Sequence, residues 1–494
     1  MEKLSYQVLA ELGYDGYLLK QAPERVLQFG EGNFLRAFVD HFIDEMNEKA
    51  GFNGKAVLVQ PRGNHPGSAQ RINAQEGLYT LILRGRENGA PVSRRRVISS
   101  VSRCLSPIGD YQALMDCAKN PDLRFIVSNT TEAGIVFDPD CKADDAPPAS
   151  FPGKLTQFLY ERYKLGLPGF IILPCELSDH NGSELKKCVD KYIGLWGLGE
   201  DFRSWVMDHN VFCSTVVDRI VTGYPRAEAP ALWQELGYED HILDTGEVFG
   251  SWVIEGPQSI RDQLPFEKAG LPVIVTKDHV PYKQRKVRIL NGAHTSMVLG
   301  AYLAGQDIVR GCMEDPVILG FMNKTIYDEI IPTLDLPRKD LEDFAAAVSQ
   351  RFNNPYIDHA LLDISLNSTA KWKARVLPSL TEYVKRVGSL PPCLTFSFAA
   401  YVAFYHSAKE QGENCLTGLR GADTYAVRDD QWVLDFYYDH RDDGAKAIVH
   451  AVVTNDRMWD GVLAPIPGFE NAVVKALERI EAVGPYEAMK EVQG

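Results

Sequence analysis

Three polar side chains that lie close together in the sequence carry the clearest chemical signal: Lys286, Asn291 and His294. If their segment is an α-helix, they fall at about 0°, 140° and 80° around its axis, and so share one side. The apolar run 297–299 follows, so we expect the segment to be buried. A buried lysine is costly unless it is paired or its pKa is lowered, and a lysine with a lowered pKa can exchange a proton with an alcohol. The cluster therefore predicts an acid–base centre, with solvated or structural helix residues as the alternative.

A turn with two glycines is the second candidate. The run 25–29 predicts a strand, and Gly30 and Gly32 follow it before a helical stretch. Glycines at such a turn let backbone N–H groups approach a pyrophosphate, and the helix N-terminus favours the anion. The third glycine of the usual dinucleotide pattern is absent, since Leu35 occupies its place, so an ordinary strand-to-helix turn is the alternative. The strand before the turn and the helix after it favour a bound dinucleotide.

The end of the second predicted strand does not decide which dinucleotide binds. An acid there usually bonds the ribose hydroxyls of NAD. Here the strand 56–60 ends in Gln60, Pro61 and Arg62, and an arginine would suit a 2′-phosphate. These residues alone do not separate NAD from NADP.

The elements that must position these residues change character along the chain. Short β-branched runs, typical of strands between crossover helices, occur at 25–29, 56–60, 80–83, 124–127, 170–173 and 273–275. Long helical periods follow at 291–304, 316–331, 340–352, 392–410 and 471–483. We predict an α/β dinucleotide-binding domain with a mostly parallel sheet over 1–280. A mainly α-helical substrate-binding and catalytic domain is predicted over 281–494.

Composition excludes several classes of protein. The net charge of −14 disfavours a nucleic-acid partner, which needs a basic face. The longest apolar run, 394–405, is too short to span a membrane, and the N-terminus predicts no secretory signal. The nine cysteines form no C-x-x-C pair, which disfavours a disulfide framework or structural zinc. We expect a cytoplasmic protein with a small-molecule partner, no membrane partner and no structural zinc.

The K-x-x-x-x-N-x-x-H pattern resembles the signature of the polyol-specific long-chain dehydrogenase family, which includes mannitol 2-dehydrogenase. Four further segments fit the same family in the same order: 30–37, 130–134, 175–182 and 217–220. The resemblance covers nearly the whole chain. It implies an N-terminal Rossmann-type domain with insertions, then a helical domain.

The resemblance also implies a mechanism without a catalytic metal. Lys286 would be the general acid and base, and Asn291 and His294 would polarise a carbonyl group. Within the family, the likeness is greatest to members that act on hexuronates. It implies NAD(H)-linked interconversion of D-altronate and D-tagaturonate, by a monomer or a homodimer.

Further site residues are carried over on the motifs that match. The expected cofactor contacts are Phe29, Gly30, Gly32, Asn33, Phe34, Arg36, Asn129, Thr130 and Glu132, of which Glu132 would also relay protons. The expected substrate contacts are Glu176, Asp218 and Lys371. Two positions depart from the pattern: Leu177 replaces an asparagine, and Asp363 replaces an arginine. For the substrate carboxylate the candidates are Lys371, Lys373 and Arg375, with Lys371 favoured.

Two alternatives remain open. The chain could be a fructuronate/mannonate or polyol dehydrogenase of the same family. It could instead be a non-catalytic dinucleotide-binding sensor, which would need no Lys-Asn-His cluster.

Overall fold

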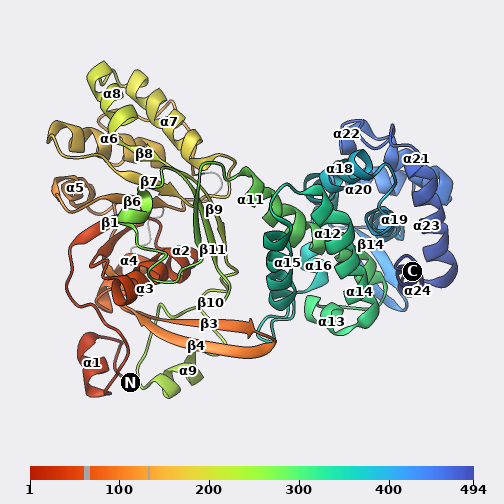
Figure 1. Ribbon diagram of the computed structural model, residues 1–494, viewed down its shortest axis with the longest axis horizontal. Coiled ribbons are helices and arrows are strands. Elements are labelled where there is room, and N and C mark those ends of the chain that lie inside the picture. The colour runs from red at the N-terminus through yellow and green to blue at the C-terminus, as the bar shows by residue number, and fades with distance from the viewer. Residues whose placement is uncertain (61–66, 132–133) are drawn as a thin grey trace. The chain divides into compact units, whose positions relative to one another are not determined.

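The computed structural model describes residues 1–60, 67–131 and 134–494 (Figure 1). The chain divides into two compact units. Unit one comprises Met1–Gly85 and Val92–His279, and unit two comprises Arg86–Pro91 and Val280–Gly494. No helix among the described residues is long and apolar enough to cross a membrane. All nine cysteines are unpaired, and eight of them are buried.

A six-stranded parallel sheet forms the centre of unit one. Its strands lie in the order β5-β2-β1-β6-β7-β8. Their bounds are β1 Glu24–Phe29, β2 Lys55–Val59, β5 Val101–Leu105, β6 Phe125–Ser128, β7 Ile171–Pro174 and β8 Val211–Phe212. With the hairpin β3–β4 set aside, this is the 3-2-1-4-5-6 order of a Rossmann sheet. The predicted α/β class is confirmed.

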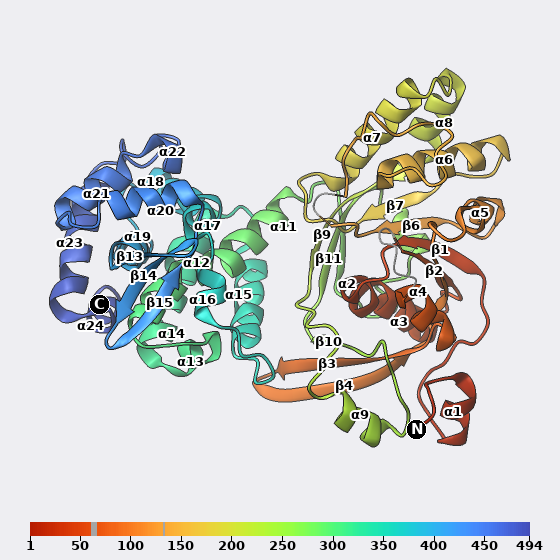
Figure 2. The same cartoon turned by 180° about the vertical axis from the view of Figure 1, so that it is seen from behind.

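Helices cover both faces of this sheet (Figures 1 and 2), which explains why most residues in its strands are apolar. Neighbouring residues of β1 face opposite sides: Val26 packs in one cluster with Phe42, and Leu27 in another with Phe158. The first cluster includes α3 (His41–Ala50). The second includes α5 (Tyr111–Asp116), α6 (Phe151–Lys164), α7 (Asn181–Leu195) and α8 (Glu200–His209). The other α-helices among the described residues of this unit are α1 (Tyr6–Glu11), α2 (Asn33–Leu35), α4 (Gly67–Ala74), α9 (Ala229–Leu236) and α10 (Ile260–Gln263).

Two small sheets are the insertions of unit one. One joins β10 (Asp244–Glu247), β3 (Tyr79–Glu87) and β4 (Ala90–Ile98). The other joins β12 (Val273–Thr276), β11 (Ser251–Glu255) and β9 (Ser214–Asp218). The strands predicted at 80–83 and 273–275 therefore exist, but they lie in these small sheets and not in the main parallel one.

Unit two is built around α19 (Pro392–His406), which is buried almost throughout and packs against α12 (Gly292–Leu303) and α23 (Phe469–Val483). Its other helices include α11 (Val280–Arg285), α13 (Val309–Glu314), α14 (Pro316–Lys324), α15 (Arg338–Phe352), α16 (Leu361–Ser365), α17 (Ser368–Arg375), α18 (Leu377–Val387), α20 (Gln431–Asp439), α21 (Ala445–Val453), α22 (Asp456–Trp459) and α24 (Pro485–Glu491). The predicted helical class is confirmed.

The predicted helix 392–410 is too long. After His406 the chain enters an antiparallel sheet of β13 (Ala408–Gly412), β14 (Cys415–Arg420) and β15 (Asp423–Val427), drawn in blue in Figure 2. These strands are short and mostly polar on their exposed side, so no long apolar alternation announces them.

Candidate active site

The glycine turn lies at the point where the strand order of the main sheet reverses. The chain runs outward from β1 to β2 and β5, then returns to β6 on the other side of β1. Gly30 directly follows β1, and Asn129 directly follows β6. The Gly30 N–H donates to the carbonyl of Val59, and the Asn129 N–H donates to that of Phe29, both across this edge. In open α/β sheets ligands bind at this switch point, beyond the carboxyl ends of the strands.

Gly30 is a glycine for a physical reason. Its φ is +137°, and a Cβ there would lie 3.0 Å from Leu35 Cδ1 and 3.2 Å from the Asn129 carbonyl oxygen. Gly32 caps α2, and the helical stretch continues through a π-turn at Arg36–Asp40 into α3. The turn thus presents bare backbone at the start of a long helical segment, which suits a pyrophosphate.

Other predicted cofactor residues brace this turn from inside the protein. Arg36 is buried, and its guanidinium donates to the carbonyl of Glu31 (3.1 Å) and to Asn33 Oδ1 (2.6 Å). It also donates to the carbonyl of Ile242 and lies 3.6 Å from Asp244. A side chain so fully occupied holds the loop in shape.

Two aromatic candidates of the turn also pack within unit one. The Phe29 ring is fully buried, 5.0 Å from that of Phe151, and the Phe34 ring stacks at 5.2 Å on Phe38. Contacts from these residues to a ligand would therefore come from the backbone of Phe29 and the half-buried face of Phe34.

Glu176 supports the segment that follows β6. It is buried and accepts hydrogen bonds from the Thr130 N–H (2.9 Å), Thr130 Oγ1 (3.0 Å) and Ser128 Oγ (3.0 Å). Burial raises the pKa of this carboxyl above its usual value, while the donors from Thr130 oppose the rise. Leu177, which replaces the family asparagine, is 60% exposed. The remaining predicted residue here, Glu132, lies outside the described residues.

Asp218, expected to contact substrate, ends β9 and is buried, opposite Ser251 in β11.

Two of the three predicted catalytic residues lie on a π-helical turn. Residues Lys286–Asn291 form this turn between α11 and α12. The α-helical wheel, which separates Lys286 from Asn291 by about 140°, is therefore wrong for this segment. In a π-turn the hydrogen bonds join residues five apart, so Lys286 and Asn291 lie one above the other. His294 follows three residues later in α12.

The His294 ring is buried and tightly held. It stacks on Phe352 at 3.8 Å with 12° between the rings, and His359 meets it edge-on at 5.7 Å. Burial lowers the pKa of His294 well below its usual value, and the neighbouring charges of His359, Arg351, Arg375 and Lys371 lower it further. The imidazole is therefore neutral at pH 7.

His294 Nε2 is the atom of this ring that is available to a ligand. It is buried and has no hydrogen-bond partner among the described residues. A buried polar atom of this kind is costly unless something else satisfies it. A substrate oxygen in front of His294 would do so.

Of the two lysines predicted for the substrate carboxylate, Lys371 lies near His294 and Lys373 does not. Lys371 is half-buried and donates from Nζ to the carbonyl of Ile364 (2.8 Å). Burial lowers the pKa of Lys371, and Arg375 lowers it further. Lys373 instead pairs with Asp460 (2.7 Å), which is largely exposed. Lys373 is thus held at the surface.

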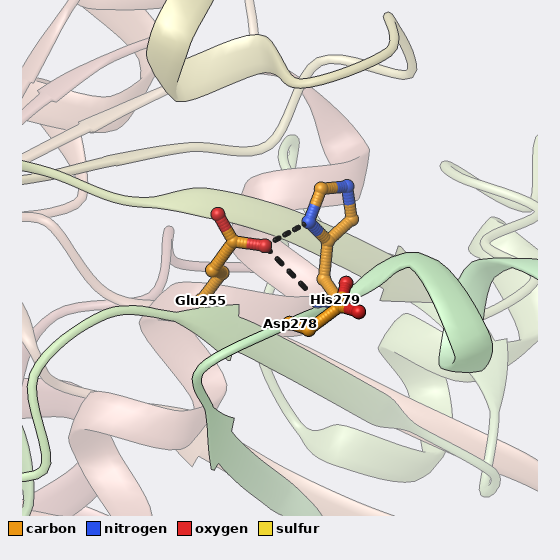
Figure 3. A group of neighbouring side chains, drawn as sticks. All are labelled: Glu255, Asp278 and His279. Carbon is orange, nitrogen blue, oxygen red and sulfur yellow. Dashed lines mark hydrogen bonds and ion pairs between the residues drawn. The ribbon is translucent and has the colours of Figure 1, made fainter. Parts of the chain in front are cut away.

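Near the last residue of unit one lies a cluster of two acidic side chains and a histidine, which the sequence patterns did not predict. The ligand atoms of Glu255, Asp278 and His279 lie within 4.8 Å of one another, so among the described residues they could hold a metal ion (Figure 3). One oxygen of Glu255 already accepts from the His279 N–H (3.0 Å) and lies 2.6 Å from His279 Nδ1. These bonds tie β11 to the segment after β12.

A cavity of about 590 Å³ in unit one is separate from the residues above. None of the described candidate residues lines it. Its charged lining is paired within the protein: Arg96 bonds Asp44 and Glu48, and Lys49 pairs with Glu45. We assign it no role in the reaction.

Taken together, a Rossmann sheet with a glycine turn at its switch point and a chain that carries the predicted Lys-Asn-His pattern indicate a dinucleotide-binding dehydrogenase. Two family models match almost the whole chain. The mannitol dehydrogenase Rossmann domain matches residues 24–268, and the mannitol dehydrogenase C-terminal domain matches residues 278–481. The chain belongs to the mannitol dehydrogenase family.

Curated relatives are similar over nearly full length. The altronate oxidoreductase of Enterobacter sp. (strain 638) is 45% identical over 482 residues, or 95% of this chain and 97% of its own. That of Klebsiella pneumoniae (strain 342) is 46% identical over the same shares.

Solved structures share the fold. A substrate-free D-sorbitol dehydrogenase aligns with a TM-score of 0.84 at 21% identity, over 99% of this chain and 100% of its own. Pseudomonas fluorescens mannitol 2-dehydrogenase, in a ternary complex with NAD and D-mannitol, aligns with a TM-score of 0.70 at 22% identity, over 99% of both chains.

Proposed function

We propose that this protein is an NAD(H)-dependent oxidoreductase that interconverts D-tagaturonate and D-altronate. The observation that carries the proposal is the 46% identity, over 95% of the chain, to relatives named altronate oxidoreductase. The Lys-Asn-His cluster supports it, because a keto-acid reduction needs an acid and donors to the carbonyl oxygen.

The two parts of the chain divide the work in this proposal. Residues 1–280 hold the dinucleotide, with the backbone at Gly30 and Gly32 facing the pyrophosphate and the segment at Asn129 and Thr130 beside it. The bare backbone of the turn fits such a ligand, since a side chain at Gly30 would fill it. NADH, when bound, supplies the hydride that reduces the keto carbon. Residues 281–494 supply the acid–base chemistry and the substrate contacts.

Each residue of the cluster has one role. Neutral His294 donates from Nε2 to the keto oxygen, and the Asn291 amide donates to the same oxygen as negative charge develops on it. Lys286 gives its proton to that oxygen during reduction and takes it back during oxidation. Because His294 is already neutral at pH 7, it donates without competing for the proton that Lys286 transfers.

The substrate contacts are assigned by proximity. Lys371 acts on His294 through its charge and is therefore proposed to contact the sugar acid. Glu176, which accepts a hydrogen bond from the Thr130 N–H, is also proposed to contact the substrate. The same role is proposed for Asp218, at the end of β9.

A substrate panel tests the proposal. NADH oxidation is followed by absorbance with D-tagaturonate, D-fructuronate and D-fructose as substrates. We expect D-tagaturonate to give the highest kcat/KM by at least an order of magnitude. A higher value for D-fructuronate or for D-fructose would assign the chain to the fructuronate/mannonate or the polyol alternative. Binding of NADH without turnover of any of the three would support the sensor.

A further inference from the structure

Four positively charged or titratable side chains gather around His294 from different parts of unit two. They are Arg351, His359, Lys371 and Arg375, and the charge of each lowers the pKa of His294. Lys371 and Arg375 lie four residues apart in α17, so they share one face of that helix.

The backbone at the end of α17 is brought close to the catalytic segment. A Cβ at Gly292 would lie 3.1 Å from the carbonyl oxygen of Arg375, so this close approach needs the glycine that follows Asn291. Arg375 is thus anchored beside the turn that carries the catalytic residues.

Acids do not closely balance the charges of His359 and Lys371. Asp363 acts on His359 but is exposed. Asp429 acts on Lys371, yet it already accepts from the Tyr405 hydroxyl (2.5 Å) and the Thr369 N–H (3.2 Å).

Arg375 is the member of the group with the most unused bonding capacity. Across the described part of the chain, its guanidinium donates no hydrogen bond and has no acidic partner. It is half-buried, and burial lowers its pKa. A guanidinium held partly out of water without an anion is unfavourable, and its planar fork matches a carboxylate with two parallel bonds.

We propose that Arg375, at the helix end beside Gly292, and His359, whose ring contacts that of His294, form the receptor for the carboxylate of the sugar-acid substrate, and that they make the enzyme select an acid over a neutral sugar. The inference rests on the proposed function, because it places the keto end of the substrate at His294. In a keto-hexuronate the carboxylate lies at the opposite end of the carbon chain from the ketone. A receptor that is near His294 but distinct from it fits this separation.

The alternative role of Arg375 is structural. It is the last residue of α17, where a positive charge stabilises the helix end. A structural role would change thermal stability and affect all substrates equally, whereas a receptor changes the preference between an acid and a neutral substrate.

Kinetics with matched substrates separate the two roles. Arg375→Gln, Arg375→Lys and the control Lys373→Gln are compared with the wild type, with D-tagaturonate and the neutral ketose D-tagatose as substrates. In Arg375→Gln we expect the ratio of kcat/KM for the acid to that for the ketose to fall by about 10²-fold, mostly through KM, as for loss of one partner of a desolvated charge pair. Arg375→Lys should recover part of the ratio, and Lys373→Gln should leave it unchanged.

A binding measurement keeps the outcome independent of turnover. Calorimetry with the NAD⁺-loaded enzyme compares a hexonate with the corresponding hexitol. Loss of hexonate binding in Arg375→Gln, with hexitol binding retained, supports the receptor. A wild type that prefers the hexonate, with the same preference in Arg375→Gln, overturns the receptor and leaves the proposed function standing. A wild type that prefers the hexitol in binding and the ketose in turnover overturns both.

Discussion

Asp40→Asn should stabilise the protein, and more so as the pH rises. Asp40 is fully buried behind the glycine turn: its carboxylate lies 3.3 Å from Gln28 Nε2, which also donates to the carbonyl of Gly30 (3.1 Å). Burial raises the pKa of Asp40 from its usual 3.8 to about 7, with Gln28 and Arg36 opposing the rise. At about 1.36 kcal/mol per pKa unit, the difference between these two pKa values lowers the free energy of unfolding by at most roughly 4 kcal/mol at high pH.

The sign of the pH dependence follows from which state binds the proton more tightly. Because the folded pKa lies above the unfolded one, the folded wild type keeps a proton that the unfolded chain releases. Its stability therefore falls, relative to Asp40→Asn, as the pH rises from about 4 to about 7. Above that window both states are ionised, and the difference stays constant.

Thermal unfolding from pH 4.5 to 8 measures this difference. We expect the advantage in Tm of Asp40→Asn to grow across the window, by about 2–4 °C for each kcal/mol. Asp208→Asn, at an exposed position of α8, is the matched control and should show no such growth. An advantage that is independent of pH, or that shrinks as the pH rises, would refute the assignment of a buried and largely protonated Asp40.

Two further predictions concern cofactor and metal. Gly30→Ala should weaken NADH binding at least about 10-fold, because φ +137° strains an alanine by about 1–3 kcal/mol and its Cβ would meet Leu35 and Asn129; a fluorescence titration giving an unchanged Kd would remove the turn from the cofactor site. Treatment with a chelator followed by dialysis should leave turnover intact, and a loss that zinc restores would instead point to Glu255, Asp278 and His279.

Much of the fold follows from local sequence patterns. The strand at 25–29 and its neighbours were predictable because both faces of the main sheet are covered, which favours short runs of mostly apolar residues. The sheet β13–β15 was not, because its strands are short and the helical period of α19 runs on into them. The π-turn at Lys286–Asn291 was also missed, since a helical wheel assumes α-helical geometry.

The candidate site residues could be proposed from sequence where they belong to local motifs, but their tertiary contacts could not. Gly30 and His294 follow from motif spacing. Arg36 contacts Asp244 and the carbonyl of Ile242, which lie more than two hundred positions away in the sequence. No local pattern shows these contacts. Spacing alone could have separated Lys373 from Lys371 and Arg375: the last two are one helical turn apart, and Lys373 lies on another face.

The most direct test of the central claim is single-turnover reduction of D-tagaturonate by Lys286→Ala, with NADH affinity measured on the same preparation. We expect an NADH Kd within about two-fold of the wild-type value and a rate lower by at least about 10³-fold, since proton transfer alone typically contributes 10²–10⁴-fold. Near-normal reduction by this variant would contradict the assignment of Lys286 as the acid that protonates the substrate.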